Sequence, residues 1–197
     1  MNIPMEQKNM KTNSKKPLII VFAGPNGSGK STITEYVDKH DCVYVNADLI
    51  KSTMHCSDLE AAQIACEKRE ELLKSKSDFV FETVLSTRRN LDLLIRAKNE
   101  GYFIKCFYVL TTDPSINVSR VLNRVSEGGH DVPKDKIVKR YYRAMQLIPE
   151  LINVCDVIHI YDNSIEPFRI FKKRKDEIYI WANADWDENR IKQLTEK

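Results

Sequence analysis

The sequence predicts an α/β fold in which a mostly parallel, five-stranded sheet is covered by helices on both faces. Short runs of apolar, β-branched and aromatic residues alternate with segments of helical periodicity. This alternation is typical of a parallel sheet between two helical layers. After Ser164 the pattern changes to two short apolar runs around a basic turn, which indicates a C-terminal β-hairpin followed by a short helix.

The elements follow one another in a regular order along the chain. Expected strands cover residues 18–23, 42–46, 78–82, 102–110 and 156–161. Expected helices cover residues 30–40, 58–76, 88–99, 114–126 and 134–153. Gly101 stands just past the third helix, and Pro114 and Pro133 open the last two, as helix-stop and helix-start signals require. The hairpin and final helix are expected within residues 166–197.

Length and composition limit the class of protein. A chain of 197 residues, with 42% hydrophobic and 30% charged residues, fits a single soluble domain. We expect residues 17–197 to form it, after a flexible, polar tail over residues 1–16. No apolar run approaches the length of a membrane span, so we expect no membrane association. The five widely spaced cysteines indicate reduced thiols and a cytoplasmic location.

A glycine-rich octet directly follows the first strand. Residues 24–31 match the pattern G-x-x-x-x-G-K-S/T, in which backbone N–H groups and a helix N-terminus surround phosphate groups. Lys30 can reach the β- and γ-phosphates of ATP, and the Ser31 hydroxyl can ligate Mg²⁺. The alternative is an ordinary Gly-Ser turn. The expected nucleotide-binding residues here are Gly24, Pro25, Asn26, Gly27, Ser28, Gly29, Lys30, Ser31 and Thr32.

Two acids follow strands whose carboxyl ends meet at the ligand-binding edge of such a sheet. Asp48 comes just after the second strand, and Glu82 closes the third and precedes Thr83. A phosphotransferase needs a carboxylate to accept the proton of the acceptor hydroxyl and acidic groups near Mg²⁺. The alternative interpretations are a helix cap or turn for Asp48 and a solvated strand end for Glu82.

A basic segment over residues 120–143 predicts a lid. Arg124 and Arg140 flank a loop that begins with Gly128 and Gly129 and also contains His130. Arginines on a lid can neutralise the transferring phosphoryl group and exclude water. The alternative is a solvated helix face, because runs of Lys and Arg usually form one.

Taken together, these residues resemble the zeta-toxin family of P-loop kinases, in its compact branch. The resemblance rests on residues 24–31, Asn46-Ala47-Asp48, Phe81-Glu82-Thr83, the stretch from Arg124 through Gly128–Pro133 to Arg140-Tyr141, and Tyr161–Ser164. It implies a P-loop kinase fold with the loop-bearing strand in the centre of the sheet.

The resemblance also implies roles for the residues. Asp48 would be the general base, and Glu82 would lie near the acceptor sugar. Thr83 and His130 are further candidates for substrate binding; the alternative for His130 is that it organises the loop. Lys30, Arg124 and Arg140 would stabilise the transferring phosphoryl group, and Asn163 would lie near adenine. Well-known members phosphorylate UDP-N-acetylglucosamine at the sugar 3′-hydroxyl, and many pair with an antitoxin. This chain is shorter than those members and lacks their glycine after Glu82.

The leading hypothesis is therefore an ATP- and Mg²⁺-dependent kinase acting on a hydroxyl of a small molecule, with a nucleotide sugar as the candidate acceptor and an antitoxin as a candidate partner. A second hypothesis is a nucleic-acid end kinase or binding protein that uses residues 172–175 and 134–143. The net charge of +3 and the lack of an aromatic-interleaved basic patch in the sequence argue against it. A third is an inactive nucleotide-dependent regulator, against which the retained Lys30, Ser31, Asp48 and Glu82 argue.

Overall fold

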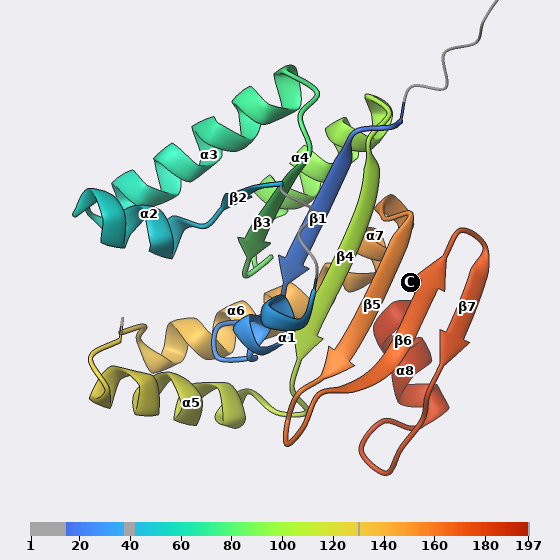
Figure 1. Ribbon diagram of the computed structural model, residues 1–197. Helices are drawn as coiled ribbons and strands as arrows, with labels where there is room; N and C mark the ends of the chain where they lie inside the picture. The colour runs from blue at the N-terminus through green and yellow to red at the C-terminus, as the bar shows by residue number, and fades with distance from the viewer. Residues whose placement is uncertain (1–14, 38–41, 130, 197) are drawn as a thin grey trace, which may run out of the picture.

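A computed structural model describes residues 15–37, 42–129 and 131–196. The expected tail over residues 1–16 therefore lies almost entirely outside the described residues. The strands are β1 (Leu18–Ala23), β2 (Val43–Val45), β3 (Phe79–Thr83), β4 (Phe103–Leu110), β5 (Val157–Asp162), β6 (Phe168–Arg174) and β7 (Glu177–Ile180) (Figure 1). The helices are α1 (Lys30–Tyr36), α2 (Ala47–Met54), α3 (Asp58–Lys74), α4 (Arg88–Asn99), α5 (Pro114–Ser126), α6 (Lys134–Gln146), α7 (Ile148–Val154) and α8 (Glu188–Thr195).

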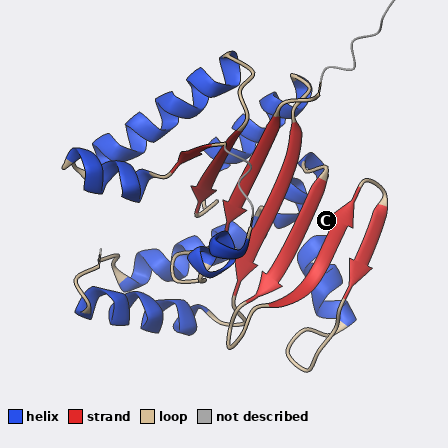
Figure 2. Ribbon diagram, in the orientation of Figure 1, coloured by secondary structure: helices blue, strands red, loops and turns tan. Residues whose placement is uncertain are grey.

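All described strands join one sheet in the order β2-β3-β1-β4-β5-β6-β7. The first five pair in parallel with β1 in the centre, as predicted, and β6 and β7 continue the sheet antiparallel. The sheet thus has seven strands rather than five, and the hairpin is its edge rather than a separate appendage (Figure 2). The physical reason is that β5 would otherwise expose a row of unpaired backbone groups. The short connection after β5 lets the next strand fold back beside it.

Helices lie on both faces of the sheet, but they cover the faces unequally. Alternate residues of β1 point to opposite sides. Ile20 and Phe22 pack with Ile33 of α1, whereas Ile19 and Val21 belong to the large core formed with α3, α4, α7 and α8. On the α1 side, no helix lies in front of β6 and β7 (Figure 1). The three-layer arrangement is confirmed, with one short helix as its thin layer.

The helices differ from the prediction in three places. The helix expected over residues 30–40 ends at Tyr36, because Val37 is already extended. The helix expected over residues 134–153 is broken into α6 and α7 at Leu147, because Pro149 cannot donate to the preceding turn and instead sits in the first turn of α7. Helix α2 was not predicted; it has no buried residue, so it lacks the apolar periodicity that reveals a helix. Within the described ranges, no helix combines the length and apolar character that spanning a bilayer requires.

Candidate functional site

The loop over residues 24–29 connects the central strand β1 to α1, and its backbone requires glycine. Gly24 and Gly29 have φ values of 144° and 84°. A Cβ on Gly24 would lie 2.0 Å from the Val109 carbonyl oxygen, and one on Gly29 would lie 2.1 Å from Asn163 Nδ2. The chain therefore approaches its surroundings more closely than any other residue allows. The last glycine directly precedes the first residue of α1, so the positive end of that helix faces the loop.

Two buried asparagines hold the loop from outside. Asn117 of α5 is fully buried; its Nδ2 donates to the Asn26 carbonyl oxygen at 2.6 Å, and its Oδ1 accepts from the Thr111 hydroxyl. Asn163 donates from Nδ2 to the Ser28 carbonyl oxygen at 2.9 Å. The loop is thus fixed at two carbonyl groups by segments far away in the sequence.

Arg120 in turn fixes the segment that follows β5. Its guanidinium donates to the carbonyl oxygens of Asn163 at 2.7 Å and of Ser164 at 2.9 Å. The prediction that Asn163 lies near adenine stays a prediction, since its side chain is 5% exposed and contacts the loop backbone. Neither Asn117 nor Arg120 was among the predicted site residues. The one available signal for Asn117 was a polar side chain beside apolar Val118 and Val121 on its helix.

Lys30 lies half-buried at the start of α1. Its Nζ donates to the carbonyl oxygens of Gly24 at 2.8 Å and Pro25 at 3.1 Å. Burial lowers the pKa of Lys30 to about 8, while the carboxylates of Glu82 and Asp48 oppose this shift. The ammonium is therefore partly desolvated beside a loop shaped for anions, and a bound phosphate would favour its charged form.

A chain of hydrogen bonds links the Glu82 carboxylate to the backbone N–H of Asp48. The side chain of Asn46 caps α2 by accepting from the backbone N–H groups of Asp48 at 2.8 Å and Leu49 at 3.2 Å. Its Nδ2 donates to the Tyr44 hydroxyl at 3.1 Å, and that hydroxyl donates to Glu82. Burial and the bond to Glu82 raise the pKa of Tyr44 well above its usual range. The cap thus places Asp48, exposed in the first turn of α2, in fixed relation to Glu82.

Tyr44 was missed in the sequence, although its strand position contains a signal. It pairs with Val80 in the β2–β3 register, so it shares a sheet face with Glu82 two residues further along. Thr83, in contrast, is buried, and its hydroxyl accepts from Leu85 N at 2.9 Å and Asn90 Nδ2 at 2.8 Å. Its contacts shape the chain after β3, and its role in binding an acceptor stays a prediction.

The predicted lid lies beside the loop, where α5 and α6 pack against each other (Figure 1). Arg140 Nη1 donates to Asn26 Oδ1 at 3.3 Å, and the positive charge of Arg124 contributes to lowering the pKa of Lys30. Both arginines therefore act on the phosphate loop. His130, predicted to contact substrate, lies outside the described residues.

Glycine is needed at positions 128 and 129 of the lid for two different structural reasons. Gly128 ends α5 in the left-handed region, with a φ of 87°, and a Cβ on it would meet nothing within 4 Å. A Cβ on Gly129 would lie 2.6 Å from Arg124 Cγ and 2.8 Å from the Arg124 carbonyl oxygen. The first glycine is thus needed for the turn, and the second for its close approach to Arg124.

The oxygen ligands around the loop fit a magnesium ion that arrives with phosphates. No group of three or more His, Cys, Asp and Glu side chains suited to a metal occurs among the described residues. The Ser31 hydroxyl is exposed at the start of α1, and the Glu82 carboxylate acts electrostatically on the neighbouring Lys30. Mg²⁺ prefers such hard oxygen ligands and commonly takes one or two carboxylates together with substrate phosphates.

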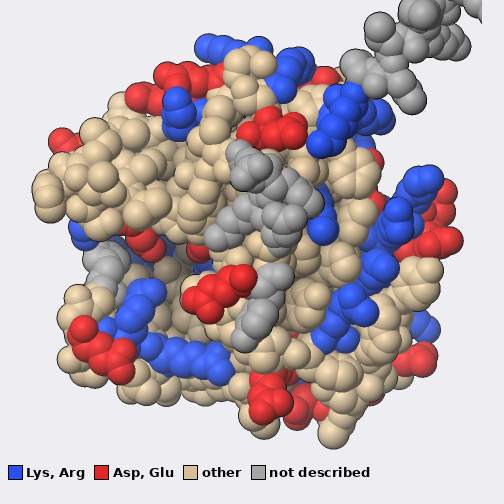
Figure 3. Space-filling view, viewed as in Figure 1, with Lys and Arg blue, Asp and Glu red and all other residues tan. Residues whose placement is uncertain are grey.

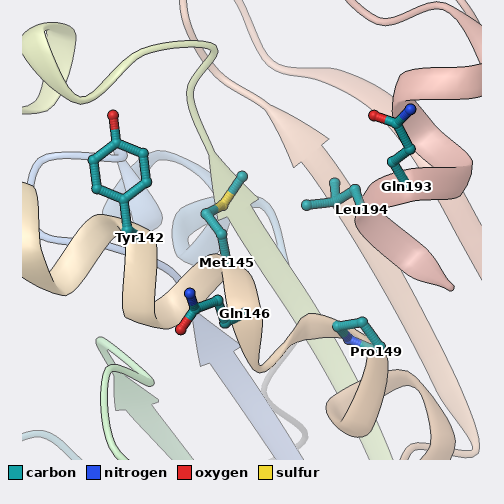
Figure 4. A pocket seen from close by; sticks show the side chains of 6 residues that line it. All are labelled: Tyr142, Met145, Gln146, Pro149, Gln193 and Leu194. Carbon is teal, nitrogen blue, oxygen red and sulfur yellow. The ribbon is translucent and has the colours of Figure 1, made fainter. Parts of the chain in front are cut away.

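One hollow in the surface is lined by none of the loop residues. It is open and is lined by side chains of α6, α7 and α8: Tyr142, Met145, Gln146, Pro149, Gln193 and Leu194 (Figure 4). None of these residues belongs to the phosphate loop, to the acid pair or to the arginine pair. The polar groups suited to phosphate chemistry therefore gather at the loop, at the carboxyl ends of the parallel strands.

The model of the zeta toxin family matches residues 4–185, which is most of the chain. The chain belongs to the zeta toxin family. The match includes every residue on which the resemblance was based. An uncharacterised protein of Haemophilus influenzae is 27% identical to this zeta toxin family member over 127 residues, which are 62% of this chain and 91% of that protein.

Solved structures show the same fold. A structure from the PezAT chromosomal toxin–antitoxin system of Streptococcus pneumoniae superposes with a TM-score of 0.65 at 18% identity, covering 95% of this chain and 82% of that one. The AvrRxo1-ORF1:-ORF2 structure with ATP gives a TM-score of 0.65 at 15% identity, covering 85% of this chain. This zeta toxin family member spans only 61% of the length of that second structure.

Proposed function

We propose that this zeta toxin family member is an ATP- and Mg²⁺-dependent kinase that transfers the γ-phosphate to a hydroxyl group of a small molecule. One observation carries the proposal: two carboxylates, that of Asp48 at the capped start of α2 and that of Glu82 bonded to Tyr44, and a pair of arginines lie around a phosphate loop. The carboxylates of Asp48 and Glu82 act on Lys30 from the acceptor side, and Arg140 contacts Asn26 from the lid. Family membership and the kinase-like fold support the same conclusion.

In this proposal the acceptor oxygen attacks the γ-phosphorus, the bond to the β,γ-bridging oxygen breaks, and ADP leaves. Asp48 accepts the proton of the attacking hydroxyl. Lys30, Arg124 and Arg140 stabilise the charge that spreads over the transferring group. Bound beside Ser31, Mg²⁺ would neutralise the β- and γ-phosphate oxygens.

Glu82 is the proposed anchor for the acceptor, because Tyr44 and Asn46 fix its position while Asp48 is left exposed. A nucleotide sugar such as UDP-N-acetylglucosamine is the acceptor class that the family suggests. We also propose that residues 17–197 act as one domain in the cytoplasm, which the five free cysteines support. An antitoxin is the proposed protein partner, on the basis of the likeness to the PezAT structure.

The decisive variant is Asp48→Asn, which keeps the shape of the side chain and removes its basicity. We expect ATP binding by calorimetry to stay within about twofold of the unchanged protein, whereas phosphate transfer falls by about 10²–10⁴-fold. Transfer is measured with labelled ATP and a pool of cellular metabolites, and products are identified by mass spectrometry. The matched control is Asp92→Asn on α4, which removes an exposed carboxylate whose ion-pair partner is Arg88 rather than Lys30.

The outcomes separate the parts of the proposal. Full transfer by the Asp48→Asn variant would show that another group is the base. A failure of the unchanged protein to bind ATP with Mg²⁺ would reject the kinase altogether.

A further inference from the structure

The face of the sheet that carries α1 continues across β5, β6 and β7 without helical cover. Strand register places Phe107, His159, Lys172 and Tyr179 in one row across four neighbouring strands. Phe107 stacks on Phe22, which fixes this row on the α1 side. In the space-filling view of this face, basic atoms form a line where Figure 1 places β6 (Figure 3).

Cations and aromatic rings alternate on this surface. Lys105 lies 5.0 Å from the Phe107 ring centroid and Lys172 lies 5.2 Å from that of Tyr179. The Arg169 guanidinium lies 4.3 Å from the Trp181 ring. The His159 ring stacks between those of Phe107 and Tyr161, with centroids 5.2 and 6.3 Å apart. We call the surface formed by Lys105, His159, Arg169, Lys172, Tyr179 and Trp181 the basic sheet face.

Among the described residues, the cations of the basic sheet face lack ion-pair partners, and the carboxylate next to it on β7, Glu177, instead accepts a hydrogen bond from the Tyr179 hydroxyl at 2.9 Å. Within the described part of the chain, no carboxylate lies in salt-bridge range of Lys105, Arg169 or Lys172, whereas surface lysines elsewhere, such as Lys98 and Lys139, have such partners. Arg169 Nε and His159 Nδ1 are buried without a hydrogen-bond partner. Burial and the three cations lower the pKa of His159 to about 4. A bound anion would relieve this mutual repulsion.

The sequence could not reveal this arrangement. Residues 172–175 read as one basic run, but alternate side chains of β6 point to opposite faces. Lys173 faces α7 and donates to the Ile152 carbonyl oxygen at 2.9 Å, while Lys172 stays on the basic sheet face. The aromatic residues come from neighbouring strands, so the interleaving exists only across the sheet.

We propose that the basic sheet face binds single-stranded nucleic acid. Its cations lie on two strands, and the two on β6, Arg169 and Lys172, are three residues apart, which is about 10 Å along a strand and more than one phosphate covers. Aromatic rings among the cations favour a ligand that carries both phosphates and unpaired bases over an acidic peptide or a duplex. Asp48 follows β2 and Glu82 lies in β3, and β1 separates both strands from the basic sheet face. We therefore propose the nucleic acid as a bound partner and not as the phosphoryl acceptor.

The test measures binding of the full chain to a fluorescently labelled 12-nucleotide oligouridylate by anisotropy, over a series of salt concentrations. Three phosphates neutralised by Lys105, Arg169 and Lys172 predict a slope of log K against log salt of about −2. The double variant Lys105→Gln/Lys172→Gln should reduce the magnitude of this slope by about 1.4 and weaken binding about 25-fold at 0.1 M salt.

The matched control is Lys68→Gln/Lys74→Gln on α3, which removes the same charge from exposed positions outside the phosphate loop and the lid; we expect an effect of about twofold or less. Equal losses in the two double variants would reject the basic sheet face as the site. ATP binding should be unchanged in both, which keeps this test separate from that of the kinase proposal.

Two further readouts test the nature of the ligand. Trp181→Ala should weaken binding about fivefold or more through lost stacking, and nuclear magnetic resonance should show the pKa of His159 rising when the oligonucleotide binds. Equal binding of a 12-residue oligoglutamate would overturn the proposal in favour of an acidic protein. The absence of binding at 50 mM salt would also overturn it.

Discussion

Burial lowers the pKa of Lys30 to about 8, although Glu82 and Asp48 act in the opposite direction. At neutral pH the side chain is therefore still charged, and its N–H groups bond to the loop's own carbonyl oxygens. Triphosphate oxygens would replace these carbonyls as partners and stabilise the ammonium. The affinity for nucleotide should therefore fall as the pH rises through the pKa of Lys30.

We expect ATP binding to take up protons above pH 8. The free protein has a Lys30 pKa of about 8 and the complex a higher one, so affinity is complete below that value and falls as pH rises through it. At pH 8.5 about 0.7 proton should be taken up. Calorimetry in two buffers of different ionisation enthalpy measures this uptake, and Lys30→Met should abolish it. A binding enthalpy that does not depend on the buffer at pH 8.5 would contradict the assignment.

At the level of elements, the C-terminal end of α5 determines where Arg124 lies. The backbone N–H of Gly129 donates to the Arg124 carbonyl oxygen at 2.9 Å, and that of Gly128 donates to Val125 O at 3.0 Å. Such bonds close a helix whose last turn continues directly into the loop. The geometry of this turn therefore couples the lid loop to the arginine proposed to act on phosphate.

Alanine substitutions of the two lid glycines should separate folding from function. Gly128→Ala places a side chain in open space but in the left-handed region, so it should cost about 1–2 kcal/mol of stability and leave phosphate transfer within about twofold. Gly129→Ala must displace Arg124 and should reduce transfer about tenfold or more. Thermal melting and transfer to the metabolite pool measure the two effects. Equal loss of transfer in both variants would contradict the distinction.

The sequence predicted the elements with local signals and missed those without. Phe79–Thr83 and Phe103–Leu110 form strands within a residue of expectation because their apolar runs are continuous. Helix α2 has no fully buried residue and only Ala47 and Ile50 pack against the core, so the sequence contains little apolar periodicity to indicate it. The joining of the hairpin to the sheet depends on the free edge of β5, which only a three-dimensional arrangement contains.

On the scale of the whole molecule, the unpredicted features are contacts between distant segments. The octet, Asp48 and Glu82 follow strands directly, so local pattern sufficed to propose them. Asn117 and Asn26 are 91 residues apart, and Arg120 reaches a segment 43 residues away. These contacts depend on how α5 and the end of β5 pack around the loop, and no local pattern encodes that packing.

Those same contacts make nucleotide binding a property of the whole fold, which thermal melting can measure. ATP with Mg²⁺ at 100 times its dissociation constant should stabilise the folded state by about 2.7 kcal/mol. For a chain of this size that corresponds to a rise in Tm of about 5–11 °C. Lys30→Met should remove most of the rise. The Asp48→Asn and Lys105→Gln/Lys172→Gln variants should keep it, because neither acts on the triphosphate in our proposals. If ATP with Mg²⁺ no longer raised the Tm of the Asp48→Asn variant, the Asp48 carboxylate would belong to the nucleotide site rather than to the acceptor site.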